Sequence, residues 1–299
     1  MLSLLFGILS PIALATGIHT DQVPCPIGKD VAKIFFVLSS NEYGGYDSDG
    51  ATYSSGMQYR NYEISTCPQT LYSALGADMK TSWTEEEEQK ILEIINKTTA
   101  TFQKPKLPEI WERYEIAIEI YRWQEKPSTF LISLYQKATW SIRDEAVGIH
   151  EGLAGPIVTD QVLEAGKKEL QKNLTAEQRK MVLYNLARAA HRNARFKQRK
   201  EYITQFMSLS DLSPAEKKAG ERFLELTEVI EPNYLEKTKK EVERYLKENP
   251  TDGQMLYLLG DLHRRLDDIE SCKRYFHAAN LTNDLQEEQR QIMHYLLSN

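Results

Sequence analysis

A long series of helical segments fills the second half of the chain, and this feature constrains the fold more than any other. From Trp111 onward, apolar residues recur at the spacing of a helix face, and short segments rich in turn-forming residues separate them. The separators are EKPST, NLTAEQ, LSPAE, EPNY, NPTDG and LTNDL. A pair of such helices cannot bury its apolar faces alone. Successive pairs are therefore expected to stack into a curved solenoid with a concave face.

The last helix pair has the spacing of a tetratricopeptide-like repeat. Its first helix carries Leu256, Leu259, Gly260 and His263, and its second helix carries Cys272, Phe276 and Ala279. Gly260 is expected to let the two helices approach closely, and Cys272 to be a buried packing thiol. A less regular match begins at Leu183, and residues 214–248 are expected to form another helix pair. The predicted fold class is mainly α, with a small N-terminal β-containing module followed by a tetratricopeptide-like α-solenoid over residues 105–299.

Residues 16–104 are expected to form the small N-terminal module, with β-structure and one helix. Ile34–Leu38 is an apolar strand, and a second strand is expected from Tyr59 through the segment NYEIST. Further along the chain, Thr84 and Glu87 have the spacing of a capping box that begins a helix.

An acidic stretch, Asp47–Gly50, lies between the two expected strands. It resembles the start of a calcium-binding loop, but the later ligand positions of such a loop are not acidic here. A turn-forming cluster is therefore favoured over a calcium site.

The first residues predict export. Residues 1–17 carry no charge, and their apolar run ends in Ala13-Leu14-Ala15, the small-x-small spacing that signal peptidase accepts. Residues 1–15 are therefore interpreted as a signal peptide, although the usual Lys or Arg before the apolar run is absent. The alternative is a buried N-terminal helix. The run is shorter than the roughly 20 residues that span a bilayer. The expected location is the periplasm.

The cysteines indicate a cross-link. Cys25 and Cys67 each precede a proline, as in half of a zinc knuckle, but Gly28 and Thr70 stand where further thiolate ligands are needed. A zinc site is therefore disfavoured, and no metal or cofactor is predicted. In an exported protein, the two cysteines are expected to form a disulfide. Two unpaired thiols or a redox-active pair are the alternatives, although catalytic cysteine pairs usually lie closer together in the sequence.

The layout resembles an uncharacterised bacterial family in which a small cysteine-knuckle module with a Cys-Pro-x-Cys motif precedes tetratricopeptide-like helices. The resemblance rests on Cys25-Pro26 and on the segments NEYGGYDSDG, STCP and YQKATWSIRD. Where that family keeps four thiols, this chain has Gly28 and Thr70, so the resemblance implies the architecture without the zinc. It implies no activity.

Charge and motifs exclude several functional classes. With 43 acidic and 37 basic residues, the chain lacks the net positive charge of a nucleic-acid-binding protein. No nucleophile elbow, phosphate-binding loop, zinc-protease motif or dinucleotide fingerprint is present in the sequence. His150 and Glu151 are adjacent in the segment GIHEGLAGP, but such a pair is more often a loop contact than a catalytic base. No catalytic residue is predicted.

A basic segment, RAAHRNARFKQRK from Arg188 to Lys200, contains no acidic residue and predicts a positive patch. The predicted partner-binding residues on this patch and on the concave face are Tyr184, Arg188, His191, Arg192, Arg195, Tyr257, Asp261 and Arg264. For any single residue, a solvated helix corner is the simpler alternative.

The sequence therefore predicts a non-enzymatic exported scaffold that binds another protein through the concave face. The partner is expected to offer an acidic segment or a C-terminal carboxylate, and contact with an anionic membrane surface is a further prediction. The alternatives are a metal-binding or redox module that uses Cys25 and Cys67, or a cell-envelope hydrolase.

Overall fold

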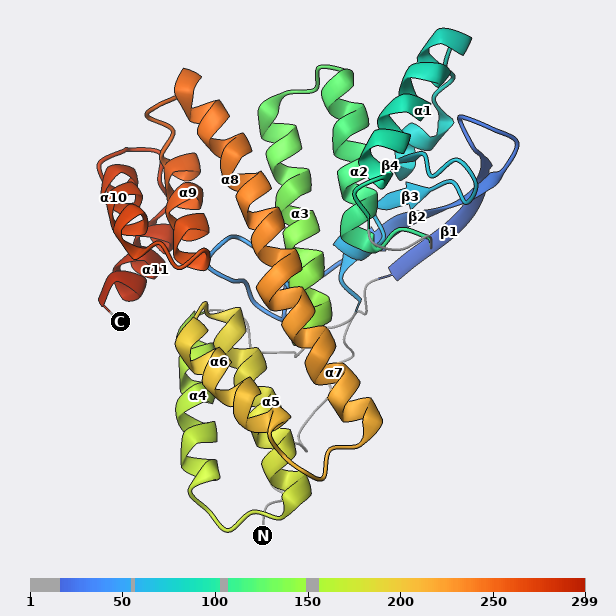
Figure 1. The fold of residues 1–299 in the computed structure, drawn as a ribbon. Coiled ribbons are helices and arrows are strands. Elements are labelled where there is room, and N and C mark those ends of the chain that lie inside the picture. Colours follow the sequence, from blue (N-terminus) through green and yellow to red (C-terminus); the bar gives the residue numbers. More distant parts are fainter. Residues whose placement is uncertain (1–16, 55–56, 103–106, 149–155, 299) are drawn as a thin grey trace.

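The computed structural model describes residues 17–54, 57–102, 107–148 and 156–298 (Figure 1). The N-terminal part contains β1 (Gly17–Pro24), β2 (Val31–Ser39), the short helix η1 (Tyr59–Asn61), β3 (Ile64–Thr66), β4 (Ser73–Leu75) and η2 (Gly76–Lys80). Then follow α1 (Glu85–Thr99), α2 (Ile110–Trp123), α3 (Ser128–Val147), α4 (Pro156–Leu170), α5 (Ala176–Arg192), α6 (Phe196–Met207), α7 (Pro214–Glu225), the π turn η3 (Leu226–Ile230), α8 (Glu231–Glu248), α9 (Gly253–Arg265), α10 (Ile269–Asn280) and α11 (Glu287–Ser298). The fold is mainly α with a small N-terminal β module, as the sequence predicts.

Two antiparallel hairpins build the β module, β1 with β2 and β3 with β4. The predicted strand Ile34–Leu38 lies within β2, whereas β1 has no counterpart among the predicted elements. In the second predicted strand, only β3 is extended, because Tyr59 begins the short helix η1. Cys25 and Cys67 form a disulfide with their Cα atoms 5.9 Å apart, which confirms the predicted cross-link. It joins the turn of the first hairpin to the end of β3.

The helix pair α9–α10 packs as its sequence spacing predicts. A Cβ atom added at Gly260 would lie 2.4 Å from Cδ1 of Phe276, so the two helices approach this closely only because a glycine is present. Cys272 is 3% exposed and packs in the same cluster as Phe276. The close approach at Gly260 and the burial of Cys272 are therefore both confirmed.

Residues 214–248 do not form the predicted helix pair. Instead α7, η3 and α8 follow one another without a break (Figure 1). The N–H of Glu231 bonds to the carbonyl of Leu226, five residues back, as in a π-helix. Pro232 offers a reason, because a proline has no N–H and its ring clashes with the carbonyl four residues earlier. The widened turn before Pro232 lets the helix continue, so the expected separator EPNY lies inside a helix.

The series of helices curves until its last helix, α11, contacts α4, so its concave face is not open. Tyr295 of α11 donates a hydrogen bond to Asp160 of α4 at 2.7 Å, across 135 residues of sequence. Arg195, just before α6, binds the same carboxylate at 2.7 Å. The space enclosed by the helices is filled by residues 47–53, which reach across from the β module to α9 (Figure 1). The prediction of an open concave face is therefore wrong.

One hydrophobic cluster runs through both predicted domains, from Val23 in β1 to Tyr234 in α8. Tyr121 of α2 also donates a hydrogen bond to Asp78 of η2 at 2.5 Å. The division of the chain after residue 104 stays a prediction. Among the described helices, none is both long and apolar enough to span a membrane. The predicted signal peptide, residues 1–15, lies outside the described residues.

Candidate functional site

The acidic loop Asp47–Tyr53, called the central loop from here on, lies at the centre of the molecule. Asp47, Ser48 and Asp49 are all buried although their side chains are polar. Tyr53 donates a hydrogen bond to Oδ2 of Asp47 at 2.7 Å. Because burying an unpaired charge is costly, the surrounding helices must supply partners for these carboxylates.

Arginines from three helices supply them. They are Arg143 of α3, Arg192 of α5 and Arg265 of α9. Arg143 donates to Asp49 at 2.7 Å, and Nε of Arg192 donates to Asp47 at 3.1 Å. Burial raises the pKa of Asp49, but the positive charges of Arg143 and Arg265 outweigh that effect and hold the pKa below its usual range. Asp49 is therefore ionised, and both carboxylates are paired with arginines of the surrounding helices.

Helix α9 binds the central loop from the other side. Arg264 and Arg265 donate to Oγ of Ser48 at 2.8 and 3.1 Å, and both also bind Asp261. The hydroxyl of Tyr257 donates to the backbone carbonyl of Ser48 at 2.7 Å. The loop therefore ties α9 to the N-terminal part of the chain through hydrogen bonds that span more than two-thirds of the sequence.

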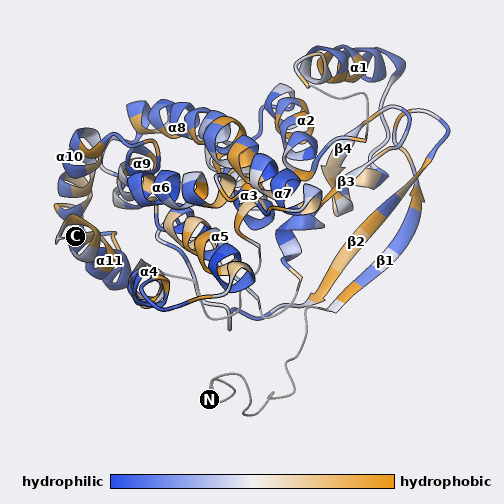
Figure 2. Ribbon diagram, turned by 60° about the horizontal axis from the view of Figure 1, so that its bottom comes forward, coloured by the Kyte–Doolittle hydropathy of each residue, from blue (hydrophilic) through white to orange (hydrophobic). Residues whose placement is uncertain are grey.

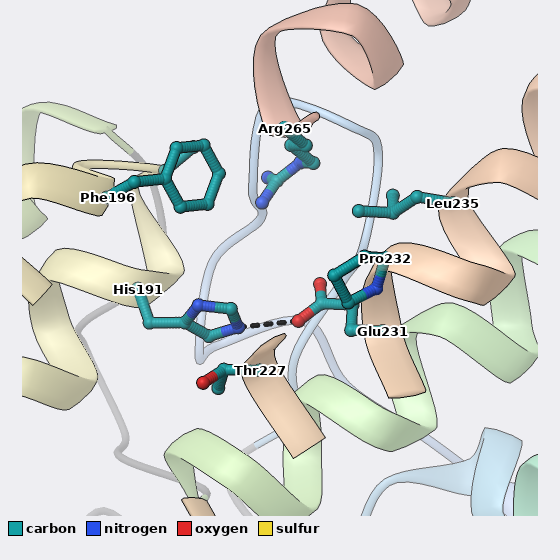
Figure 3. A pocket seen from close by; sticks show the side chains of 8 residues that line it. His191, Phe196, Thr227, Glu231, Pro232, Leu235 and Arg265 are labelled. Atoms are coloured by element: carbon teal, nitrogen blue, oxygen red, sulfur yellow. Dashed lines mark hydrogen bonds and ion pairs between the residues drawn. The ribbon is translucent and has the colours of Figure 1, made fainter. Parts of the chain in front are cut away.

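His191 and Glu231 form a buried pair beside the central loop (Figure 3). Nε2 of His191 lies 2.5 Å from Oε2 of Glu231, and its Nδ1 lies 3.4 Å from Nη1 of Arg199. Because a guanidinium can only donate, the neutral imidazole with its proton on Nε2 fits both contacts. Burial lowers the pKa of His191, and the opposing effect of Glu231 does not reverse it. The pair is therefore a neutral imidazole that donates to a carboxylate.

The cavity beside this pair has a volume of only about 10 Å³ (Figure 3). This is close to the smallest volume that holds one water molecule. Its wall includes Thr227, whose buried Oγ1 has no hydrogen-bond partner in the protein and would accept or donate a bond to such a water. The cavity has no room for an organic substrate, so the His191–Glu231 pair holds α5 to α8 and does not face a substrate pocket.

Most residues that the sequence predicts to contact a partner are inaccessible. His191, Arg192, Tyr257, Asp261 and Arg264 are each 7% exposed or less. Their contacts are internal, so the prediction that they line an open binding face is corrected. Within the basic segment, Arg192 pairs with Asp47 of the central loop, whereas Arg195 pairs with Asp160 and Arg199 with Glu228. The sequence gives no signal of this, because a helix arginine that pairs with a distant buried carboxylate has the same local pattern as a solvated one.

The other predicted contact residues lie nearer the surface. Tyr184 and Arg188 are half-buried, and the guanidinium of Arg188 lies 5.7 Å from the ring centre of Tyr184. Arg195 is half-buried and bound to Asp160. These three residues do not join the others in one patch.

The geometry gives little support to a metal-binding or a redox role for the N-terminal module. In the described part of the chain, no group of three or more His, Cys, Asp or Glu residues could hold a metal ion. Cys25 and Cys67 are 8% and 0% exposed, so a reductant or a protein partner has little access to their disulfide. His150 lies outside the described residues.

A groove of about 710 Å³ opens between the end of α1, α2 and the helix that runs through η3. Its apolar lining includes Phe102, Trp111 and the π-turn residues Val229 and Ile230. Val229 and Leu107 are 59% and 56% exposed, so apolar surface extends to the edge of the groove. Sequence reasoning missed this site, and its one local signal is the apolar pair Val229-Ile230 between two glutamates just before Pro232.

Among the described residues of the groove, charged side chains surround that apolar lining, and carboxylates outnumber cations. The carboxylates are Glu109, Glu112, Glu115 and Glu225, and the cations are Arg222 and Lys237. Glu115 accepts a hydrogen bond from Tyr234 at 2.6 Å and is also paired with Lys237. Arg222 binds Glu225 at 2.7 Å and lies over the ring of Trp111. The groove thus combines an apolar floor with an acidic rim, and its volume lies in the range of ligand-binding pockets.

Comparison with known proteins finds one family. A family model described as "uncharacterized protein conserved in bacteria (DUF2225)" matches residues 18–295, and no zinc-ribbon or tetratricopeptide family is identified. Neither the curated proteins nor the solved structures contain a match to this chain. Since the match covers nearly all of the described fold, from β1 to α11, this chain belongs to that uncharacterised bacterial family.

Proposed function

We propose that this protein is a non-enzymatic exported scaffold, and that it binds a protein partner in the groove between α2 and η3 instead of on a concave face. The apolar floor and the excess of carboxylates in that groove carry the proposal. A complementary partner is an amphipathic helix with apolar residues at positions i, i+3, i+4 and i+7 and with Lys or Arg on its flanks. This partner differs in charge from the acidic segment expected from the sequence, because the central loop already occupies the buried arginines.

Two observations support a binding role over catalysis. The buried His191–Glu231 pair adjoins a cavity of about 10 Å³, which excludes a substrate. The groove is large enough for a ligand, but its Glu115 is held by Tyr234 and Lys237, and its described lining residues include no histidine or cysteine. This arrangement suits the recognition of a surface better than acid–base chemistry.

A synthetic peptide tests the groove. The probe is a fluorescein-labelled amphipathic helix with leucines on one face and lysines on its flanks, and a second peptide has glutamates in place of the lysines. Fluorescence anisotropy should show binding of the lysine peptide only. Val229→Lys should weaken it at least about tenfold, equal to about 1.4 kcal/mol, because it places a cation at the edge of the apolar floor.

Met181→Lys is the matched control. Met181 is also 59% exposed, but it lies on α5 beside a separate hollow of about 180 Å³. This variant should bind the peptide as the wild type does. Equal weakening by both variants, or no binding of the lysine peptide to the wild type, would refute the proposed groove.

Export is a separate part of the proposal. The disulfide between Cys25 and Cys67 supports it, because structural disulfides persist in oxidising compartments. Mass spectrometry of the native protein should find a mature N-terminus at Thr16 and no free thiol at Cys25. Retention of Met1 together with reduced Cys25 and Cys67 would place the protein in a reducing compartment.

A further inference from the structure

The β1–β2 hairpin leaves the body of the protein at its open end (Figure 2). Its inner half packs into the core through Val23, Ala32 and Ile34, all of which are buried. From Phe36 onward both faces of β2 are exposed, and Leu38 is 72% exposed. Figure 2 shows β2 as a largely hydrophobic strand with β1 on its outer side. An exposed apolar strand of this kind marks a surface that another molecule covers.

Strand β1 is the free edge of this hairpin. In the described residues β1 has a single neighbouring strand, β2, and its residues 19–22 are all exposed. The other edge of β2 is covered, because a Cβ atom at Gly76 of η2 would lie 3.4 Å from the carbonyl oxygen of Phe35. Between Ile18 and Val23, the edge has none of the lysines or prolines that commonly protect edge strands from pairing.

The direction of the free backbone groups follows from two hydrogen bonds. The N–H of Cys25 donates across the turn to the carbonyl of Asp30 at 2.8 Å, whereas the N–H of Gln22, three residues earlier, is bonded to Oδ1 of its neighbour Asp21 at 2.8 Å. Gln22 therefore directs its backbone groups outward, and because the pattern alternates along an antiparallel strand, Thr20 and Ile18 do the same. These outward groups form a template for one more antiparallel strand.

We propose that this strand is β1 of a second copy of the chain. A two-fold axis between two antiparallel strands is perpendicular to the sheet, so each residue opposes a residue that faces the same side. With the axis at Thr20, the outward groups of Ile18 pair with those of Gln22 in the other copy, and Thr20 pairs with Thr20. The same register places His19 opposite Asp21 twice, so the edge is complementary to itself.

Neighbouring registers and a lipid partner are less favourable. An axis at Asp21 places two aspartates opposite each other, and like charges in that position destabilise a sheet. Insertion of the hairpin into lipid leaves the outward N–H and C=O groups of β1 unpaired, at a cost of several kcal/mol for each group. A second β1 satisfies those groups, and it releases the Asp21 carboxylate from Gln22 to meet His19 of the other copy.

Cysteine cross-linking tests the register. In Thr20→Cys, the two new thiols face each other across the axis, within the Cα separation that a disulfide requires. In the control Gln22→Cys, each cysteine opposes Ile18, and the two thiols are separated by four residues of strand, about 14 Å. Mild oxidation should therefore give a covalent dimer of Thr20→Cys on a non-reducing gel and none of Gln22→Cys.

Sedimentation velocity at micromolar concentrations tests the dimer without cross-linking. The wild type should have twice the mass of one chain. Asp21→Lys should raise the dimer dissociation constant at least tenfold, because it opposes a cation to His19, and the double variant His19→Glu with Asp21→Lys should restore dimerisation. A wild type that stays monomeric, or equal cross-linking of both cysteine variants, would overturn the proposal. So would a monomer that co-sediments with phosphatidylglycerol vesicles, which would assign the hairpin to lipid.

Discussion

Replacement of Arg143 by methionine tests the physical reasoning about the central loop. The Arg143 side chain is 1% exposed and contacts Asp49 at 2.7 Å, Glu231 at 3.1 Å and Asp47 at 3.5 Å. Methionine fills much of the same space without a charge. Asp49 then keeps Arg265 as a charged neighbour, at the longer distance of 3.4 Å, and Glu231 keeps the neutral His191.

The expected loss of stability follows from these contacts. Removal of one partner from a buried ion pair costs about 3 to 5 kcal/mol, because the remaining charge is left without compensation. With an unfolding entropy of about 2.1 cal/mol/K per residue, this lowers the melting temperature of a chain of 299 residues by about 5 to 8 °C. The upper half of the range is expected here, because Arg143 serves both Asp49 and Glu231.

The effect should depend on pH with a definite sign. Burial raises the pKa of Glu231, but the hydrogen bond from His191 and the positive charge of Arg143 outweigh it and lower the pKa to about 2, from a value of 4.5 in the unfolded chain. The wild type therefore holds this stabilisation above pH 4.5 and loses it as the pH falls toward 2. Without Arg143 the pKa of Glu231 rises, and protonation then relieves the unpaired charge. The difference between wild type and variant should thus be largest near neutral pH and smaller at about pH 4.

Thermal unfolding followed by circular dichroism at the two pH values measures this difference. Arg179→Met, an exposed position on the same helix as Arg192, is the control and should change stability by about 0.5 kcal/mol or less. A loss for Arg143→Met of about the same size as the control, or a loss that does not change with pH, would refute the view that charge pairing holds the central loop.

Two further predictions concern the cross-link and a helix contact. The disulfide joins residues 42 apart, so replacement of both Cys25 and Cys67 by alanine should lower the free energy of unfolding by about 4 kcal/mol in the chain-entropy model; a reductant should then lower the melting temperature of the wild type but not of the variant. Gly260→Ala places a Cβ atom 2.4 Å from Cδ1 of Phe276 and should cost about 1 to 3 kcal/mol, measured by urea unfolding; an unchanged midpoint would show that α9 and α10 separate freely.

Local sequence patterns determined the elements that depend on contacts between residues close in the sequence. The capping box at Thr84 and Glu87 is present as predicted, with the backbone N–H of Glu87 bonded to Oγ1 of Thr84 at 3.3 Å. The spacing around Gly260 and Cys272 indicated a close helix pair, because both helices lie within one short stretch of sequence. The pairing of Cys25 with Cys67 followed from the small number of cysteines and the predicted export. In each case the interacting groups are close in sequence or few in number.

Only the tertiary structure decided where the central loop lies and which charges of the basic patch are buried. Arg192 and Asp47 are 145 residues apart, and each has the local pattern of a solvated surface residue. Whether such charges meet water or each other depends on how the helices close around the loop, which is set by the packing of the whole chain. The groove beside Val229 also depends on the packing of the whole chain, because elements that are distant in the sequence line it. The sequence by itself therefore determined which residues are helical, capped or cross-linked, and the tertiary structure decided which charges are buried, since burial is a property of the assembled chain.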